Sequence, residues 1–148
     1  MVRRPPAALL HASPDDLEAQ FYEALQQADL GKLMAVWLDD DDIACVHPGG
    51  PRLVGQAAIR ASFEAIFANG AIPVLPQGVR RLSALGCAVH HLVERIAITD
   101  VQGSRSAWVL ATNVYVKTAQ GWRLVTHHAS PGSEQPQPTA GEAPSTLH

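Results

Sequence analysis

The chain has 148 residues, of which 47% are apolar and 17% charged, and its formal net charge is −3 at pH 7. This length suits one domain with a hydrophobic core. The slightly negative net charge argues against a nucleic-acid-binding protein, and the high apolar content argues against a disordered chain. No apolar run approaches the roughly 18 residues that cross a bilayer. With no signal-peptide pattern at the N-terminus and two cysteines outside any disulfide spacing, we expect a cytoplasmic protein with a small-molecule or protein partner.

Helical patterns dominate the first half of the chain. A capping box with Pro14 at the first helical position begins an amphipathic helix over residues 13–29. The spacing of apolar residues predicts a short second helix over residues 30–37, which the following acidic run ends. Residues 43–47 ("IACVH") are typical of a strand, and residues 59–67 predict a third helix that stops at an Asn-Gly pair.

From residue 72 onward the pattern changes to strand-length segments separated by turn residues. The expected strands are "IPVL", "GVRRLSAL", "CAVHHLVERIAI", "SAWVLATNVYVK" and "GWRLVTHHAS". Helices followed by hairpins predict an α+β domain over residues 13–130, with the helices on one face of an antiparallel sheet. We expect a flexible N-terminus over residues 1–12 and a disordered, Pro/Ser/Gly-rich tail over residues 131–148.

Strand alternation indicates which side chains of the last hairpin share a face. If "TAQG" is a four-residue connection between Lys117 and Trp122, Asn113 lies opposite Thr126 and on the same face as His128. A bulge would break this pairing. The other face is apolar and needs a cover that the chain does not supply, so we expect a homodimer through the sheet. Its residues are Trp108, Leu110, Val114, Val116 and Val125.

Two strings, residues 21–67 and residues 111–130, resemble the nuclear transport factor 2-like superfamily, and within it the SnoaL-like and ketosteroid isomerase-like proteins. The first contains "WLDDDD" and "HPGGPRLVG", and the second ends in "GWRLVTHHAS". The resemblance implies a cone made by a strongly curved sheet around three helices, with a pocket at its open end. It implies one of two kinds of function. The chain would be an isomerase, cyclase or dehydratase of steroid- or polyketide-like carbonyl compounds, or a noncatalytic adaptor or association domain.

The same resemblance suggests where a site would lie. By position, the general base of ketosteroid isomerase falls on His47, and its protonated acid falls on Asn113. The phenol of the first helix has no clean match, because Gln20 takes its place and Tyr22 lies one helical step away. His128 belongs to the "W-x-x-x-x-x-H-x-S" pattern shared with the association domain of calcium/calmodulin-dependent kinase II.

These residue types suit acid–base chemistry. An imidazole titrates close to neutral pH and is a plausible general base, and an amide can donate to a developing oxyanion. We therefore predict His47 as base, Asn113 as oxyanion donor and His128 as a second acid or orienting group, with no cofactor and no metal. The residues expected to line the substrate are Tyr22, Trp37, Tyr115 and Thr126.

Structural interpretations of the same residues stay open. His47 could bond the backbone of its glycine turn, Asn113 could be a satisfied buried amide, and Trp37 could belong to the core. A metal centre made by His47, His128 and one of His90 or His91 is geometrically conceivable, but no carboxylate or cysteine stands at a useful spacing.

The function predicted from the sequence is a SnoaL-like, cofactor-free isomerase, cyclase or dehydratase acting on an apolar carbonyl compound. The alternative is a noncatalytic ligand-binding or dimeric association module of the same fold.

Overall fold

Three helices form in the computed structural model, which describes residues 12–133. They are α1 (Pro14–Gln27), α2 (Leu30–Met34) and α3 (Gln56–Phe67). The Ser13 hydroxyl accepts a hydrogen bond of 3.1 Å from the Asp16 amide, so the predicted cap of α1 is present. The termini predicted to be flexible, residues 1–12 and 131–148, lie almost wholly outside the described residues.

The strands form one six-stranded mixed sheet in the order β2-β1-β6-β5-β4-β3. All neighbouring strands are antiparallel except β1 and β6, which are parallel. The α+β fold class predicted from the sequence is confirmed. The strands are β1 (Ala44–Val46), β2 (Arg52–Val54), β3 (Val74–Ala84), β4 (Cys87–Asp100), β5 (Gly103–Thr118) and β6 (Gly121–Pro131).

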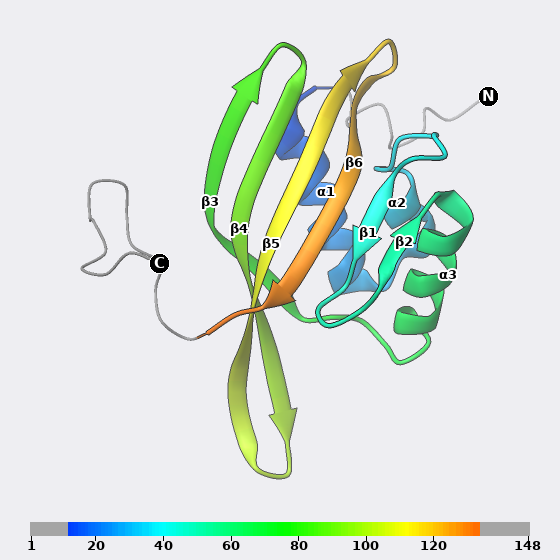
Figure 1. Ribbon diagram of the computed structural model, residues 1–148. Helices are drawn as coiled ribbons and strands as arrows, with labels where there is room; N and C mark the ends of the chain where they lie inside the picture. Colours follow the sequence, from blue (N-terminus) through cyan, green and yellow to red (C-terminus); the bar gives the residue numbers. More distant parts are fainter. Residues whose placement is uncertain (1–11, 134–148) are drawn as a thin grey trace, which may run out of the picture.

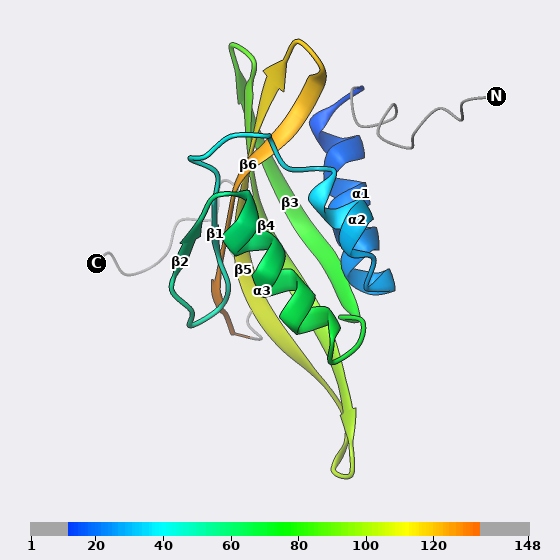
Figure 2. The same ribbon diagram turned by 90° about the vertical axis from the view of Figure 1, so that its right-hand side faces the viewer.

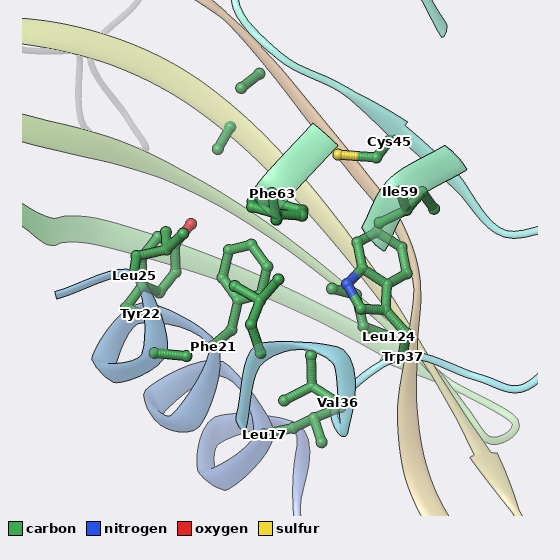
Figure 3. Packing of buried hydrophobic residues seen from close by; sticks show 14 of the residues in the cluster. Leu17, Phe21, Tyr22, Leu25, Val36, Trp37, Cys45, Ile59, Phe63 and Leu124 are labelled. Atoms are coloured by element: carbon green, nitrogen blue, oxygen red, sulfur yellow. The ribbon is translucent and has the colours of Figure 1, made fainter. Parts of the chain in front are cut away.

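All three helices lie on the inner side of the curved sheet, and the outer side carries none (Figures 1 and 2). The core fills the space between these layers. Leu17 and Phe21 of α1, Phe63 of α3 and Leu124 of β6 are each at most 2% exposed (Figure 3). None of the helices between residues 12 and 133 is long and apolar enough to cross a membrane.

The register of the last hairpin differs from the prediction. Lys117 pairs with Trp122 as expected, but the register then shifts at Val114/Tyr115, where Val125 is an extra residue on β6. Asn113 therefore pairs with His127, so its predicted pairing with Thr126 is wrong. Because one inserted residue reverses the alternation that follows, the prediction that Asn113 and His128 share a face is also wrong.

Two local differences follow from turns and bulges. The segment at residues 52–54, which the sequence left without an assignment, forms edge strand β2. "IPVL" and "GVRRLSAL" join in the single strand β3 through an irregularity between Gln77 and Arg80, where Gly78 adopts a φ of 61°.

Trp37 lies beyond the end of α2 and forms an isolated parallel bridge with Leu124. Its side chain is 3% exposed, and its indole Nε1 has no hydrogen-bond partner among the described residues. Figure 3 shows the indole beside Leu124 and Ile59. The ring therefore stabilises the fold by packing, whereas its buried N–H lowers stability because it has no hydrogen-bond acceptor among the described residues.

We expect Trp37→Phe to lower the free energy of unfolding by less than about 1.5 kcal/mol, because the lost packing is partly offset by removing the unpartnered donor. Trp37→Ala, which also empties the site, should cost about 3–5 kcal/mol. Urea unfolding of the two variants measures both values. A loss above about 3 kcal/mol in Trp37→Phe would show that Nε1 does have a partner.

Candidate functional site

A cluster of polar side chains is buried between α1 and the inner face of the sheet. Residues four apart on α1 share one helix face, and residues at even spacing on a strand share one sheet face. On neighbouring strands, His90 pairs with Asn113 and Asn113 pairs with His127, which aligns the polar groups. The members of this buried cluster are Glu18, Tyr22, His90, Glu94, Asn113, Tyr115 and His127, none more than 6% exposed.

The Glu18 carboxylate joins α1 to two strands of the sheet. One of its oxygens, Oε2, accepts hydrogen bonds from the Tyr115 hydroxyl at 2.6 Å and the Asn113 amide at 3.3 Å. The same oxygen lies 2.9 Å from Nδ1 of His90. A buried carboxylate needs such donors, because its desolvation is otherwise costly.

Glu94 has fewer hydrogen-bond partners than Glu18. Its Oε2 accepts one hydrogen bond of 2.7 Å from the Tyr22 hydroxyl. The pKa of Glu94 is raised to about 7, chiefly because the carboxyl is buried; the Tyr22 hydrogen bond opposes this rise and the nearby Glu18 adds to it. Glu94 can therefore gain and lose a proton near neutral pH.

His127 faces Glu94 with an unprotonated nitrogen. Burial lowers the pKa of His127 to about 3, with further lowering by His47 and His128, so the ring is neutral. Asn113 donates through its amide nitrogen to Glu18 and to Tyr22, so its oxygen accepts from Nδ1 of His127. This tautomer leaves the lone pair on Nε2, which lies 3.9 Å from Oε2 of Glu94.

His47 follows β1 and is half-buried against α3. Its Nε2 lies 3.0 Å from the Ser62 hydroxyl, which itself donates to the Ile59 carbonyl. The Ser62 oxygen must therefore accept from His47, and Nδ1 keeps a lone pair without a partner among the described residues. Burial lowers the pKa of His47, and the ring packs edge-on against Phe63 with centroids 4.9 Å apart.

The structure brings some of the predicted site residues together and separates others. Tyr22, Asn113 and Tyr115 belong to the buried cluster. His47 lies outside it and is joined to His127 through ring contacts with Phe63 and Phe21. Both amide hydrogens of Asn113 are already donated, so this side chain has none left for an oxyanion.

The remaining predicted residues lie elsewhere. His128 pairs with Thr112 on the outer face of the sheet, and Thr126 pairs with Val114 on that same face. His128 is exposed and cannot meet Asn113. Trp37 is a core residue beside Leu124.

Four members of the cluster were missed by the sequence-based prediction: Glu18, His90, Glu94 and His127. A signal for Glu94 existed, because it alternates in step with Ala88 and Leu92, which are small or apolar. A carboxylate in that phase of a strand points into the core. For His127 the missing signal was the bulge.

No group of three His, Cys, Asp or Glu side chains within residues 12–133 is placed to hold a metal ion. The carboxylates and imidazoles of the buried cluster instead bond to hydroxyls, amides and one another.

A family model described as SnoaL-like domain matches residues 15–134. The chain belongs to the SnoaL-like domain family. Nothing among the curated proteins matches it. The resemblance of the sequence to the SnoaL-like and nuclear transport factor 2-like proteins is therefore confirmed.

Among the solved structures similar to this SnoaL-like chain are two that are more than 30% identical to it. A proposed calcium/calmodulin-dependent protein kinase type II association domain from Thiobacillus denitrificans is 37% identical, with 82% of this chain and 96% of that chain covered and a TM-score of 0.74. A proposed dehydratase of the NTF2-like family from Streptomyces avermitilis is 31% identical, with 79% and 91% covered and a TM-score of 0.71. A calcium/calmodulin-dependent kinase II hub from S. rosetta, 20% identical, shares the fold, with 88% and 100% covered and a TM-score of 0.64.

The raised pKa of Glu94 predicts a pH-dependent stability. In the unfolded chain this carboxyl ionises near its ordinary value of 4.5, whereas in the folded protein it ionises near 7. Below about pH 4.5 Glu94 is protonated in both states and does not lower the free energy of unfolding. Between about pH 4.5 and 7 the free energy of unfolding falls as the pH rises, and above pH 7 the full loss is present. Glu94→Gln, which keeps an acceptor for Tyr22, should remove a penalty of about 1–3 kcal/mol at pH 8 and change little at pH 4.5.

Urea unfolding at the two pH values measures this difference. Glu64→Gln, at an exposed glutamate of α3, is the matched control and should show no comparable gain at pH 8. Equal pH dependence in the two variants would contradict the assignment to Glu94.

Proposed function

We propose that this SnoaL-like protein is a cofactor-free acid–base enzyme that isomerises, cyclises or dehydrates a small apolar carbonyl compound. The observation that carries the proposal is Glu94, a buried carboxyl with a pKa of about 7 beside the unprotonated nitrogen of His127. A general acid or base works best when its pKa lies near the operating pH. The two free cysteines support the cytoplasmic location expected from the sequence.

Each group has a separate part in the proposed chemistry. Glu94 donates a proton to, or takes one from, the reacting atoms, and Tyr22 holds its oxygen in place. His127 offers Nε2 as an acceptor, and Asn113 is a positioning residue that fixes the tautomer of His127. Isomerisation, cyclisation and dehydration each need one proton removed and one returned, which a paired acid and base supply without a cofactor.

His47 is the proposed base closer to solvent. The Ser62 contact fixes its tautomer with Nδ1 unprotonated, and its lowered pKa keeps it neutral at pH 7. A neutral imidazole can remove a proton next to a carbonyl group. This keeps the base role predicted from the sequence, whereas His128, on the outer face, has no part in the proposed chemistry.

The test is turnover of carbonyl compounds by the full-length protein in D₂O, followed by proton NMR. The panel contains ketones with a β-hydroxyl group and ketones with a β,γ double bond, so that elimination, double-bond migration and exchange of the α-proton each give a separate signal. We expect Glu94→Gln to lower kcat/KM by about 100-fold or more and to remove an inflection of its pH profile near 7. Glu64→Gln should stay within about twofold of the unsubstituted protein.

Turnover that survives Glu94→Gln would overturn the proposed role of Glu94. Binding of panel compounds without any turnover, unaffected by His47→Ala, would replace the enzyme by a ligand-binding module.

A second candidate function is supported by the outer face of the sheet. Alternation places Trp108, Leu110, Val114 and Val116 on the side that no described helix covers, and Leu110 is 37% exposed. The relative from Thiobacillus denitrificans, 37% identical, is described as an association domain. We propose that two copies pair through this face to form a homodimer, which is compatible with catalysis at the inner face.

Sedimentation velocity and native mass spectrometry of the full-length protein test the dimer. We expect a mass of two chains, and a shift towards one chain in Leu110→Glu, because a charge would be buried in the interface. Leu85→Glu, at a fully exposed leucine in the turn between β3 and β4, is the control and should remain dimeric. A single-chain mass for the unsubstituted protein would contradict the dimer and leave the inner site unaffected.

A further inference from the structure

Charge is segregated across the sheet. The chain has a net charge of −3, yet the strand positions that share the outer face with His91 and Thr112 include no Asp or Glu. The acidic side chains of the paired strands, Glu94 and Asp100, alternate onto the other face. The basic side chains at outer positions are Arg52, Arg80, His91, Arg95, Arg123 and His128.

Four of the outer side chains form a row across neighbouring strands. Arg80 pairs with His91, His91 with Thr112, and Thr112 with His128, from β3 through β4 and β5 to β6. These four residues and Ser130 line a hollow with a volume of about 400 Å³. Arg80, His128 and Ser130 each offer N–H or O–H donors to the hollow. His91 and Thr112 bond to each other, with 3.2 Å between Nδ1 and Oγ1, and with a neutral imidazole they keep one further donor between them. The hollow has no acidic residue in its lining.

Arg80 differs from Arg81, Arg95 and Arg123 of the same sheet. Arg52, on edge strand β2, does not line the hollow. Arg80 makes no hydrogen bond or ion pair with any residue between 12 and 133, whereas Arg81 binds Asp15 at 2.8 Å on the opposite face. Arg95 donates to Ser106 and covers the ring of Trp108, and Arg123 donates to a backbone carbonyl. Arg80 is thus the outer guanidinium whose donors remain available at the hollow.

We propose that the outer hollow binds a small molecule through an oxyanion group, a phosphate or a carboxylate, held by Arg80, His91 and His128. A guanidinium presents two parallel N–H donors to such a group, and the imidazoles and hydroxyls supply further donors along the row. Catalysis at the inner face has no use for these residues, since they point away from it. The hollow is therefore a second site, distinct from the buried cluster.

The site is compatible with the homodimer. Two outer faces that approach each other bring two sets of arginines together, and like charges disfavour the contact. An oxyanion in each hollow offsets that repulsion. The two proposals remain separately testable, because anion binding is measured as heat or chemical shift and the dimer as mass.

The test is isothermal titration calorimetry of the full-length protein with inorganic phosphate and, separately, with acetate, at constant chloride concentration. We expect saturable binding of at least one of them with a dissociation constant of about 1 mM or tighter, and the tighter ligand identifies the group recognised. Arg80→Gln should weaken binding by about tenfold or more, because it removes the bidentate donor. Arg81→Gln makes the same charge change at the next residue but on the other face, and should alter binding by less than about twofold.

Amide chemical shifts locate the bound anion, with the largest expected changes at Thr112 and Ser130. Absence of saturable binding for both anions would overturn the proposal. So would equal weakening by Arg80→Gln and Arg81→Gln, because that result indicates diffuse electrostatic attraction instead of a site.

Discussion

The arrangement of this domain depends on the burial of a carboxylate, Glu18, between a helix and a sheet. An uncompensated buried charge costs several kcal/mol, so α1 can dock only where the sheet supplies donors. Tyr115, Asn113 and His90 supply them from two neighbouring strands. Apolar packing by residues such as Leu17 and Phe21 tolerates small displacements of the helix. Hydrogen bonds to a single oxygen do not, so the polar cluster fixes the position of α1 on the sheet.

The same interaction explains why a second buried carboxyl behaves differently. The donors nearest the centre of the cluster are already directed at Glu18, and Glu94 is left with the Tyr22 hydroxyl. A carboxyl with one donor in a desolvated place holds its proton up to about neutral pH. The unequal division of donors between the two acids thus leaves Glu94 with a pKa near neutrality, where it can exchange a proton. That division is a property of the packing, and it could not be inferred from the residues nearest the glycine turn.

The sequence predicts the fold well because its signals are local. The cap at Ser13, the turn residues of the hairpins and the change from helical to alternating periodicity each determine a few neighbouring residues. The site is harder to predict because it depends on register over long separations. A single extra residue, Val125, exchanges the faces of His127 and His128, and no turn or propensity signal marks it. The buried acids were overlooked for a related reason, since Glu18 and Glu94 resemble surface residues until their partners, 72 to 97 positions away, are known.

A sheet serves two functions at once because alternate residues face opposite sides. In this domain His90, Asn113 and His127 face the helices, while their neighbours His91, Thr112 and His128 face outward. The proposed chemistry at the inner face and the proposed association and anion binding at the outer face therefore draw on separate sets of residues in the same strands. Substitutions at one set leave the backbone ladder that supports the other set intact. One fold can host unrelated functions, and two relatives of this chain are described as a proposed dehydratase and a proposed association domain. Of the proposed functions, catalysis therefore depends on Glu94 and its donors on the inner face, whereas association depends on the apolar positions around Leu110 and anion binding on the row that begins at Arg80, both on the outer face.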